Sequence, residues 1–362
     1  MSAFKDGACA LEDVNAMPAP TWGWLGMNGS RVEVPGGLGR PGAGAVDIEV
    51  AGDVRPGAGV GLATGMGDEA RAYLHGASRR HVDARVPRAG SATMAVRVAG
   101  GPGLAAVGTA DVEVGEDAEL DLLVALDAPG EGSGLVASSV RIRAERGSRV
   151  RVRCVQTAGD GYMAFDDMGI SLADDASAEV RQAVLGAGRA FGGLRAELPG
   201  DRSRIDVATD YLGRGRQVRD LNYVVRQLGR GTSAELSANG VLADESEKLL
   251  RGTIDLVRGC KGSVGTEHEA VLVAGDGVVN KTVPVILCDE DDVAGNHGAT
   301  IGHVRPDQML YLQSRGISPD AAEALFMRAV LERALADAPD ARVRDAVARC
   351  GAGVLDDMEA EA

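Results

Sequence analysis

Residues 138–156 read SSVRIRAERGSRVRVRCVQ. Apolar and polar residues alternate along both halves of this stretch, and a turn around Gly147 separates the halves. Such alternation places the apolar side chains on one face of an extended chain, so it is typical of a half-buried β-strand. The stretch therefore predicts two short strands joined by a glycine-containing turn.

The same pattern recurs from about Ser91 to Leu287. Each turn has a Gly or Asp cluster, then a small residue and a new alternating run, as in VGEDAELDL, ADDASAEVR, PGDRSRIDV, GRGTSAELS and GCKGSVGTE. The turns follow one another at about 20 to 35 residues, which is typical of a solenoid whose stacked coils share one core. No amphipathic helical segment separates the runs, so a doubly wound sheet fits poorly. An antiparallel sandwich is the alternative fold, although sandwiches usually have more aromatic core residues than the 3% found here.

The composition narrows the class of protein. The 362 residues include 38 Lys plus Arg against 53 Asp plus Glu, which gives a formal net charge of −15 at pH 7. This charge disfavours binding to the phosphate backbone of a nucleic acid. No apolar run reaches the roughly 18 residues of a membrane span, and the first residues lack the basic and apolar regions of a signal peptide. We therefore expect a cytoplasmic protein with neither nucleic acid nor membrane among its partners.

The common catalytic motifs are missing from the sequence. It contains no phosphate-binding P-loop, no HExxH and no GxSxG, which argues against nucleotide hydrolysis and the common hydrolase mechanisms. The five cysteines are far apart without a CxxC pair, so they are expected to be free thiols in a reducing cytosol. Most of them are expected to be buried in the core, where a free cysteine packs like a small apolar residue. Cys260 and Cys288 are kept as candidates for a further role.

The character of the sequence changes at both ends of the repeat region. Residues 1–45 are expected to form a short N-terminal cap segment, in which Trp22 and Trp24 pack over one end of the solenoid. Residues 46–303 are expected to form the β-helix core, and residues 304–362 a C-terminal α-helical domain. Covering the ends matters because unpaired strand edges invite aggregation.

Three helices are expected after the core. Pro306 opens the first helix, and Gly316 ends it. Ser318 caps a second helix that covers Ala321 to about Leu335, with proline in its first turn. A third is expected at Ala341–Cys350, followed by a frayed tail.

Two stretches near the end of the core carry a resemblance to a known family. Residues 283–302 read VPVILCDEDDVAGNHGATIG, and residues 308–317 read QMLYLQSRGI. Together they resemble the C-terminal core shared by SufB and SufD, scaffold proteins of iron–sulfur cluster assembly, and the likeness runs from about Leu249 to Met327. The early PTWGWL at residues 20–25 is similar to the start of short bacterial SufD-like proteins.

The resemblance implies a right-handed parallel β-helix with a C-terminal helical domain. In that family the helical domain docks the ABC-type ATPase SufC, and SufB and SufD pair through their β-helices. The histidine of the His-Gly-Ala-Thr motif lies at that interface and takes part in forming the nascent cluster; here it is His297. The SufB cysteine and glutamate positions are Val278 and Gly298 in this chain, which favours a SufD-like role in which the partner supplies thiolates.

Other candidate residues have plainer interpretations beside the functional one. We expect a docking surface for the ATPase at Tyr311, Leu312, Arg315 and Ile317. The plainer alternative is that Tyr311 and Leu312 form part of the contact between the first helix and the solenoid end. His297 is a ligand of a transient shared cluster or a hydrogen-bonded residue at the end of a coil. The remaining candidates receive no role: His268 should face away from Glu267 and Glu269, the run at 289–292 is a solvated turn, and His75 and His81 belong to no motif.

The leading hypothesis is a scaffold subunit, not an enzyme, that pairs with a SufB-like subunit and binds a SufC-like ABC ATPase without a permanently bound cofactor. A transient iron–sulfur cluster shared with the partner is the only cofactor expected. One alternative is a homodimeric SufB/SufD-like scaffold that works with SufC alone. Another is a β-helix polysaccharide lyase or hydrolase, which the low aromatic content and the expected cytoplasmic location disfavour.

Overall fold

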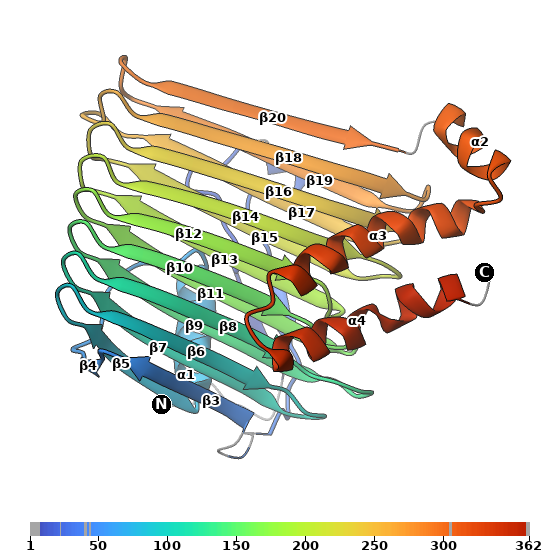
Figure 1. Cartoon of the computed structure of the whole chain (residues 1–362), viewed down its shortest axis with the longest axis horizontal. Coiled ribbons are helices and arrows are strands. Elements are labelled where there is room, and N and C mark those ends of the chain that lie inside the picture. The colour runs from blue at the N-terminus through green and yellow to red at the C-terminus, as the bar shows by residue number, and fades with distance from the viewer. Residues whose placement is uncertain (1–7, 22, 40–41, 43–44, 304–305, 360–362) are drawn as a thin grey trace.

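The computed structural model shows a parallel β-solenoid made of two nine-stranded sheets, named sheet A and sheet B here (Figure 1). It describes residues 8–21, 23–39, 42, 45–303 and 306–359. In spatial order sheet A consists of β20 (Ala294–Gly302), β18 (Val264–Ala274), β16 (Ser233–Ala243), β14 (Arg204–Gly213), β12 (Ser177–Val184), β10 (Arg149–Gln156), β8 (Glu119–Asp127), β6 (Ser91–Ala99) and β3 (Val46–Gly52). Sheet B consists of β19 (Val279–Cys288), β17 (Glu247–Leu256), β15 (Val218–Gln227), β13 (Arg189–Leu198), β11 (Tyr162–Leu172), β9 (Gly134–Ala144), β7 (Ala105–Val114), β5 (Arg80–Val86) and β4 (Arg55–Pro56). The solenoid prediction is thus confirmed, and the sandwich alternative is wrong.

Successive coils stack in parallel register. Ser91 pairs with Glu119, Glu119 with Arg149, and so on to Ala294, so that each coil takes 27 to 31 residues. At the N-terminal end the pattern changes, because β3 and β4 pair antiparallel with β6 and β5. Along each strand, alternate side chains enter the lumen between the sheets, as Val150 and Val152 of β10 do, and pack into one continuous core.

The recurrent turn motif has a simple backbone cause. In each of the six turns before β8, β10, β12, β14, β16 and β18, one residue lies in the left-handed region, where Gly is favoured and Asp is tolerated. These residues are Asp117, Gly147, Asp175, Arg202, Gly231 and Gly262. The next residue turns into the lumen at the crowded corner and is almost completely buried, which requires a small side chain; these residues are Ala118, Ser148, Ala176, Ser203, Thr232 and Ser263. The pattern of a Gly or Asp cluster and then a small residue therefore has a steric cause in these six turns.

Two C-terminal helices cover the outer face of sheet A (Figure 1). These are α3 (Pro319–Ala336) and α4 (Ala341–Glu359), preceded by α2 (Pro306–Ser314). Val330 and Leu331 of α3 and Val347 of α4 pack against outward side chains of the sheet such as Leu123. The Ser318 side chain accepts a hydrogen bond from Ala321 N at 3.1 Å, which is the predicted N-cap. The third helix is longer than predicted, since it continues past Cys350 through Gly351 and Gly353 to Glu359.

The N-terminal segment lies along the outer face of sheet B. It contains β1 (Cys9–Leu11), the 3-10 helix η1 (Gly23–Leu25) and β2 (Val32–Val34), and α1 (Asp68–Ala77) lies beside it. Leu11, Val14 and Val34 form an apolar cluster with Leu74 of α1 and with outward residues of sheet B, among them Leu135 and Phe165. The prediction that the tryptophans pack over a solenoid end is wrong for Trp24, which is 82% exposed on η1, and Trp22 lies outside the described residues.

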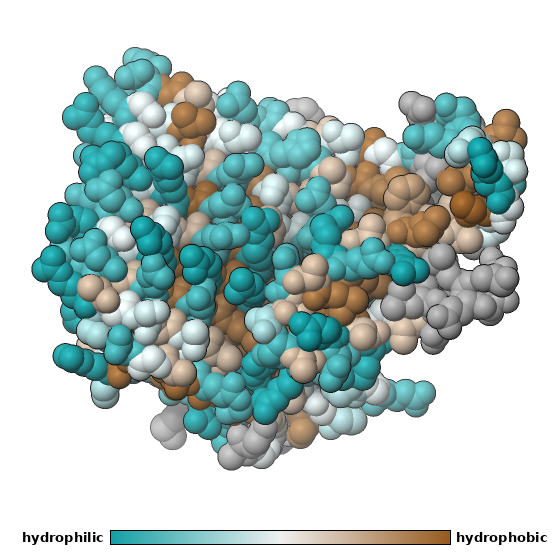
Figure 2. Space-filling view, in the orientation of Figure 1, coloured by the Kyte–Doolittle hydropathy of each residue, from teal (hydrophilic) through white to brown (hydrophobic). Residues whose placement is uncertain are grey.

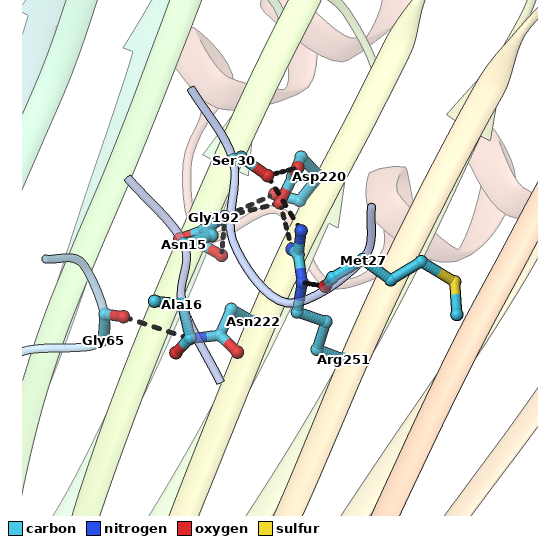
Figure 3. A network of polar contacts seen from close by, with 9 residues as sticks. All are labelled: Asn15, Ala16, Met27, Ser30, Gly65, Gly192, Asp220, Asn222 and Arg251. Carbon is cyan, nitrogen blue, oxygen red and sulfur yellow. Dashed lines mark hydrogen bonds and ion pairs between the residues drawn. The ribbon is translucent and has the colours of Figure 1, made fainter. Parts of the chain in front are cut away.

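A buried polar network fixes this segment to sheet B (Figure 3). The fully buried Arg251 of β17 donates to Asp220 Oδ1 of β15 at 2.6 Å, to Met27 O at 2.6 Å and to Ser30 Oγ at 2.8 Å. Asn15 Nδ2 also donates to Asp220 Oδ1, at 2.8 Å. Because these bonds join residues about 200 positions apart, they anchor the segment at one place on the solenoid.

Candidate functional site at the open end of the solenoid

The last coil leaves the C-terminal end of the solenoid open. Strands β20 and β19 are the terminal strands of sheets A and B, so each has one edge without a neighbouring strand. Eight of the nine residues of β20 are exposed, and Ile301 is 53% exposed. A nine-residue edge of this kind is a template for pairing with another chain. The geometry therefore makes the last coil a candidate interface.

His297 lies on this exposed strand, above a buried carboxylate. It is paired in parallel register with Glu267 of β18, and paired residues of parallel strands project from the same face of the sheet. Glu267 is in the lumen and only 5% exposed, whereas His297 is exposed. The imidazole thus stands on the lumen side of the open end.

Below His297 the lumen contains a cluster of charged and polar side chains. The fully buried Lys248 Nζ donates to Glu269 Oε1 at 2.5 Å and to Thr282 Oγ1 at 2.8 Å. The Tyr211 hydroxyl donates to the same Glu269 oxygen at 2.8 Å. Burial, and after it the neighbouring Glu269, raise the pKa of Glu267 to about 7 against the lowering effect of Lys248. Burial also lowers the pKa of Lys248, against the raising effect of Glu269.

Several polar atoms of this cluster have no hydrogen-bond partner among the described residues. They are Glu267 Oε2, Asn280 Nδ2 and Asn280 Oδ1. Asn280 of β19 pairs in register with Lys248, so it belongs to the same end of the lumen. A buried polar atom without a partner costs about 1–3 kcal/mol, and such groups require an explanation. A subunit or ligand placed on the open end would supply the missing partners.

The ligands available around His297 are oxygen and nitrogen donors. Cys288 is exposed at the last residue of β19, in the other sheet, and its thiol lies 3.2 Å from Glu290 O. Cys260 is buried at a turn, and burial raises its pKa. Across the described part of the chain, no group of three metal-ligand side chains includes His297. Residues of this chain alone therefore do not complete a metal site here.

The predicted docking residues lie on α2 and directly after it. Tyr311 is 58% exposed, Arg315 is also exposed and lies over the Tyr311 ring at 5.2 Å, and Leu312 and Ile317 are partly buried. Exposed apolar side chains extend this surface; they are Leu310 of α2 and Leu325 and Phe326 of α3. Figure 2 shows apolar side chains gathered where these two helices meet.

The charged side chains that lie in the lumen below His297 were not predicted from the sequence. Sequence reasoning predicted correctly that His268 faces away from Glu267 and Glu269, since His268 is exposed and both carboxylates are buried. It did not recognise that Lys248, Glu267 and Glu269 occupy inward positions. The sequence does contain a sign of such residues: a charged residue stands where the alternation of the strand calls for an apolar one. Lys248 in the EKLLRGTIDL of β17 is an example.

No helix in the described portion of the chain is both long and apolar enough to cross a membrane.

Comparison with known proteins agrees with this architecture. Residues 97–330 match the family described as SUF system FeS cluster assembly, SufBD core domain. The iron–sulfur cluster assembly protein SufD of Bacillus subtilis is 29% identical over 142 residues, which cover 39% of this chain and 32% of that protein. An iron–sulfur cluster assembly SufBD family protein of Pyrococcus horikoshii is 27% identical over 155 residues, covering 43% and 34%.

A further SufBD family protein, from Mycobacterium tuberculosis, is 26% identical over 135 residues, which cover 37% of this chain and 16% of that protein. The matched regions thus span about a third or less of the length of these relatives. The family match itself covers well over half of this chain and most of the solenoid. The chain therefore belongs to the SufBD core family of the SUF system of FeS cluster assembly.

Proposed function

We propose that this protein is a SufD-like scaffold subunit for iron–sulfur cluster assembly that pairs through β19 and β20 with a SufB-like subunit. The observation that carries the proposal is the open end of the solenoid, where an exposed nine-residue strand presents His297 beside buried, incompletely hydrogen-bonded carboxylate and amide groups. Backbone pairing along the exposed edges would join the two subunits. A second copy of this chain is the other possible occupant, and the mass of the purified complex distinguishes the two.

The nascent cluster is bound between the subunits and not within this chain. Iron–sulfur clusters are held mainly by thiolates, with histidine as an occasional ligand. Val278 and Gly298 stand where the SufB-type cysteine and glutamate are expected, so this chain contributes His297 and the partner contributes the sulfur ligands. The iron and sulfide are cargo, and the role of the subunit is to hold and orient them.

An ATPase of the SufC type docks on the surface formed by α2 and the first half of α3. The support is the exposed apolar group Leu310, Tyr311 and Phe326, next to the Arg315 guanidinium. Aromatic and arginine side chains of this kind are enriched at the energetically important positions of protein interfaces. Because α3 also packs on sheet A, a movement of the docked ATPase would be transmitted to the solenoid.

Replacing His297 by alanine tests the proposed ligand. The variant should co-purify with the SufB-like and SufC-like proteins as the wild type does, because His297 is exposed and its loss leaves no buried group unpaired. Cluster formation on the complex should fall at least tenfold, measured by visible absorption after anaerobic loading with iron and sulfide. His268→Ala is the matched control, since His268 is exposed on the outer face of the neighbouring strand. Equal cluster yields in both variants would remove His297 from the site, and failure of the wild type to bind either protein would contradict the scaffold role.

A further inference from the structure

A second cluster of metal-ligand side chains lies near the opposite end of the solenoid, on the outer face of sheet B. His81 and Asp83 belong to β5, and Asp111 belongs to the neighbouring β7. One ligand atom from each of the three residues lies within 4.8 Å of the other two. Asp83 and Asp111 are direct partners across the two strands, and like charges in that position destabilise a sheet unless a cation compensates them.

The surrounding residues orient each of these side chains. His81 Nδ1 lies 2.9 Å from Thr109 Oγ1, which directs Nε2 toward Asp83 Oδ1 at 3.1 Å. Metal-binding histidines commonly use their second ring nitrogen in such a hydrogen bond. Asp83 and His81 are partly exposed, with side-chain exposures of 38% and 37%, so an ion from solvent can reach them.

Asp111 is held rigidly at the base of the cluster. It is 3% exposed, receives Arg141 Nε and Nη2 at 2.6 and 2.7 Å, and receives Val60 N at 2.9 Å. A carboxylate offers about four acceptor positions, so one remains after these three bonds. Arg141 compensates the charge of Asp111 but not that of Asp83. The cluster therefore has a net negative charge when His81 is neutral.

A second imidazole stands beside the cluster. His75 of α1 has its ring centroid 6.4 Å from that of His81, and its buried Nε2 has no hydrogen-bond partner among the described residues. Because a bond from zinc to an imidazole nitrogen is about 2 Å long, two imidazoles on one ion have centroids roughly 5 to 6 Å apart. The observed 6.4 Å lies just above this range, so His75 would complete the site only after a movement of α1 or of a ring, whereas His81, Asp83 and Asp111 are already within ligand distance of one another.

We propose that His81, Asp83, Asp111 and His75 form a binding site for one divalent transition-metal ion. Two carboxylate oxygens and two imidazole nitrogens suit ions of borderline softness, such as zinc, ferrous iron or manganese. The ion would link α1 to β5 and β7, and so fix the helix on sheet B. This site is separate from His297 and does not depend on the scaffold role proposed above.

Cobalt(II) is a suitable probe, because its visible absorption reports four-coordinate binding to nitrogen and oxygen ligands. The full chain without an affinity tag should bind one equivalent of Co²⁺, and Zn²⁺ should displace it. His81→Ala and Asp83→Asn should each weaken binding at least tenfold, and both residues are exposed enough for the fold to tolerate the change. His75→Ala should also weaken it, whereas His297→Ala and His268→Ala should bind as the wild type does.

Circular dichroism of each variant shows that the solenoid is intact. Absence of stoichiometric Co²⁺ binding by the wild type would overturn the proposal. So would unchanged affinity in the folded His81→Ala and Asp83→Asn variants, because the bound metal would then lie elsewhere. The result for His297→Ala separates this site from the proposed cluster site, since loss of Co²⁺ binding in that variant alone would place the ion at the open end.

Discussion

Replacement of Lys248 by methionine is expected to lower the free energy of unfolding by about 3 to 5 kcal/mol. The ammonium group is fully buried, and it is the cation that compensates Glu269, which is 1% exposed, and the nearby Glu267. Methionine keeps the length of the aliphatic side chain but leaves the Glu269 carboxylate buried without its charge partner. The loss should appear as a lower midpoint of guanidinium denaturation.

The double variant Lys248→Met with Glu269→Gln separates the charge effect from packing. Removing both charges should recover part of the lost stability, because replacing both members of a buried pair is much less destabilising than breaking it. If Lys248→Met alone stays within about 1 kcal/mol of the wild type, the pair contributes no more than a surface ion pair, and the description of Lys248 and Glu269 as a buried, mutually compensating charge pair is wrong.

Arg251→Met is expected to be similarly destabilising, by about 3 to 5 kcal/mol, and to release the N-terminal segment from sheet B. The change removes the only charged partner of Asp220 among the described residues, and with it three hydrogen bonds, to Asp220, Met27 and Ser30 (Figure 3). Limited proteolysis should then cleave between residues 12 and 30 faster than in the wild type.

A surface ion pair provides the control for that experiment. Arg216 Nε lies 2.9 Å from Glu245, but the two side chains are 85% and 64% exposed. Arg216→Met should change stability by less than about 1 kcal/mol, because exposed pairs contribute little. Equal effects of the Arg216 and Arg251 substitutions would contradict the anchoring role of the buried network.

The solenoid could be predicted because the sequence pattern that specifies each turn involves only neighbouring residues. A left-handed residue and then a small buried residue recur at each corner, as at Gly147 and Ser148, and both requirements are visible in a few neighbouring letters. The region before Ser91 has no such repeat, and for that reason α1 and the antiparallel strands β3 and β4 were not predicted. Tertiary contacts determine their place: β3 pairs with β6 of sheet A, β4 pairs with β5 of sheet B, and α1 packs on sheet B.

The candidate site was predictable only in part. His297 stands in a recognisable motif, but its neighbours come from other coils: Glu267 is 30 positions earlier, and the Tyr211 partner of Glu269 is 58 positions away. Such pairs depend on the register between coils, and this register cannot be read from the pattern of neighbouring residues. The same reason applies to Asn15 and Asp220, which are 205 positions apart. His81 received no role because it belongs to no motif, and its neighbour Asp111 is brought beside it only by the pairing of β5 with β7.

The central claim is that the last coil is the surface on which a partner subunit pairs. Backbone hydrogen exchange of this chain, alone and in complex with the SufB-like subunit, tests it most directly. We predict that amides of residues 279–302 exchange at least tenfold more slowly in the complex, with the largest change in β20. Unchanged exchange in β20, with slower exchange only on the outer faces of the sheets or in the helices, would contradict the claim.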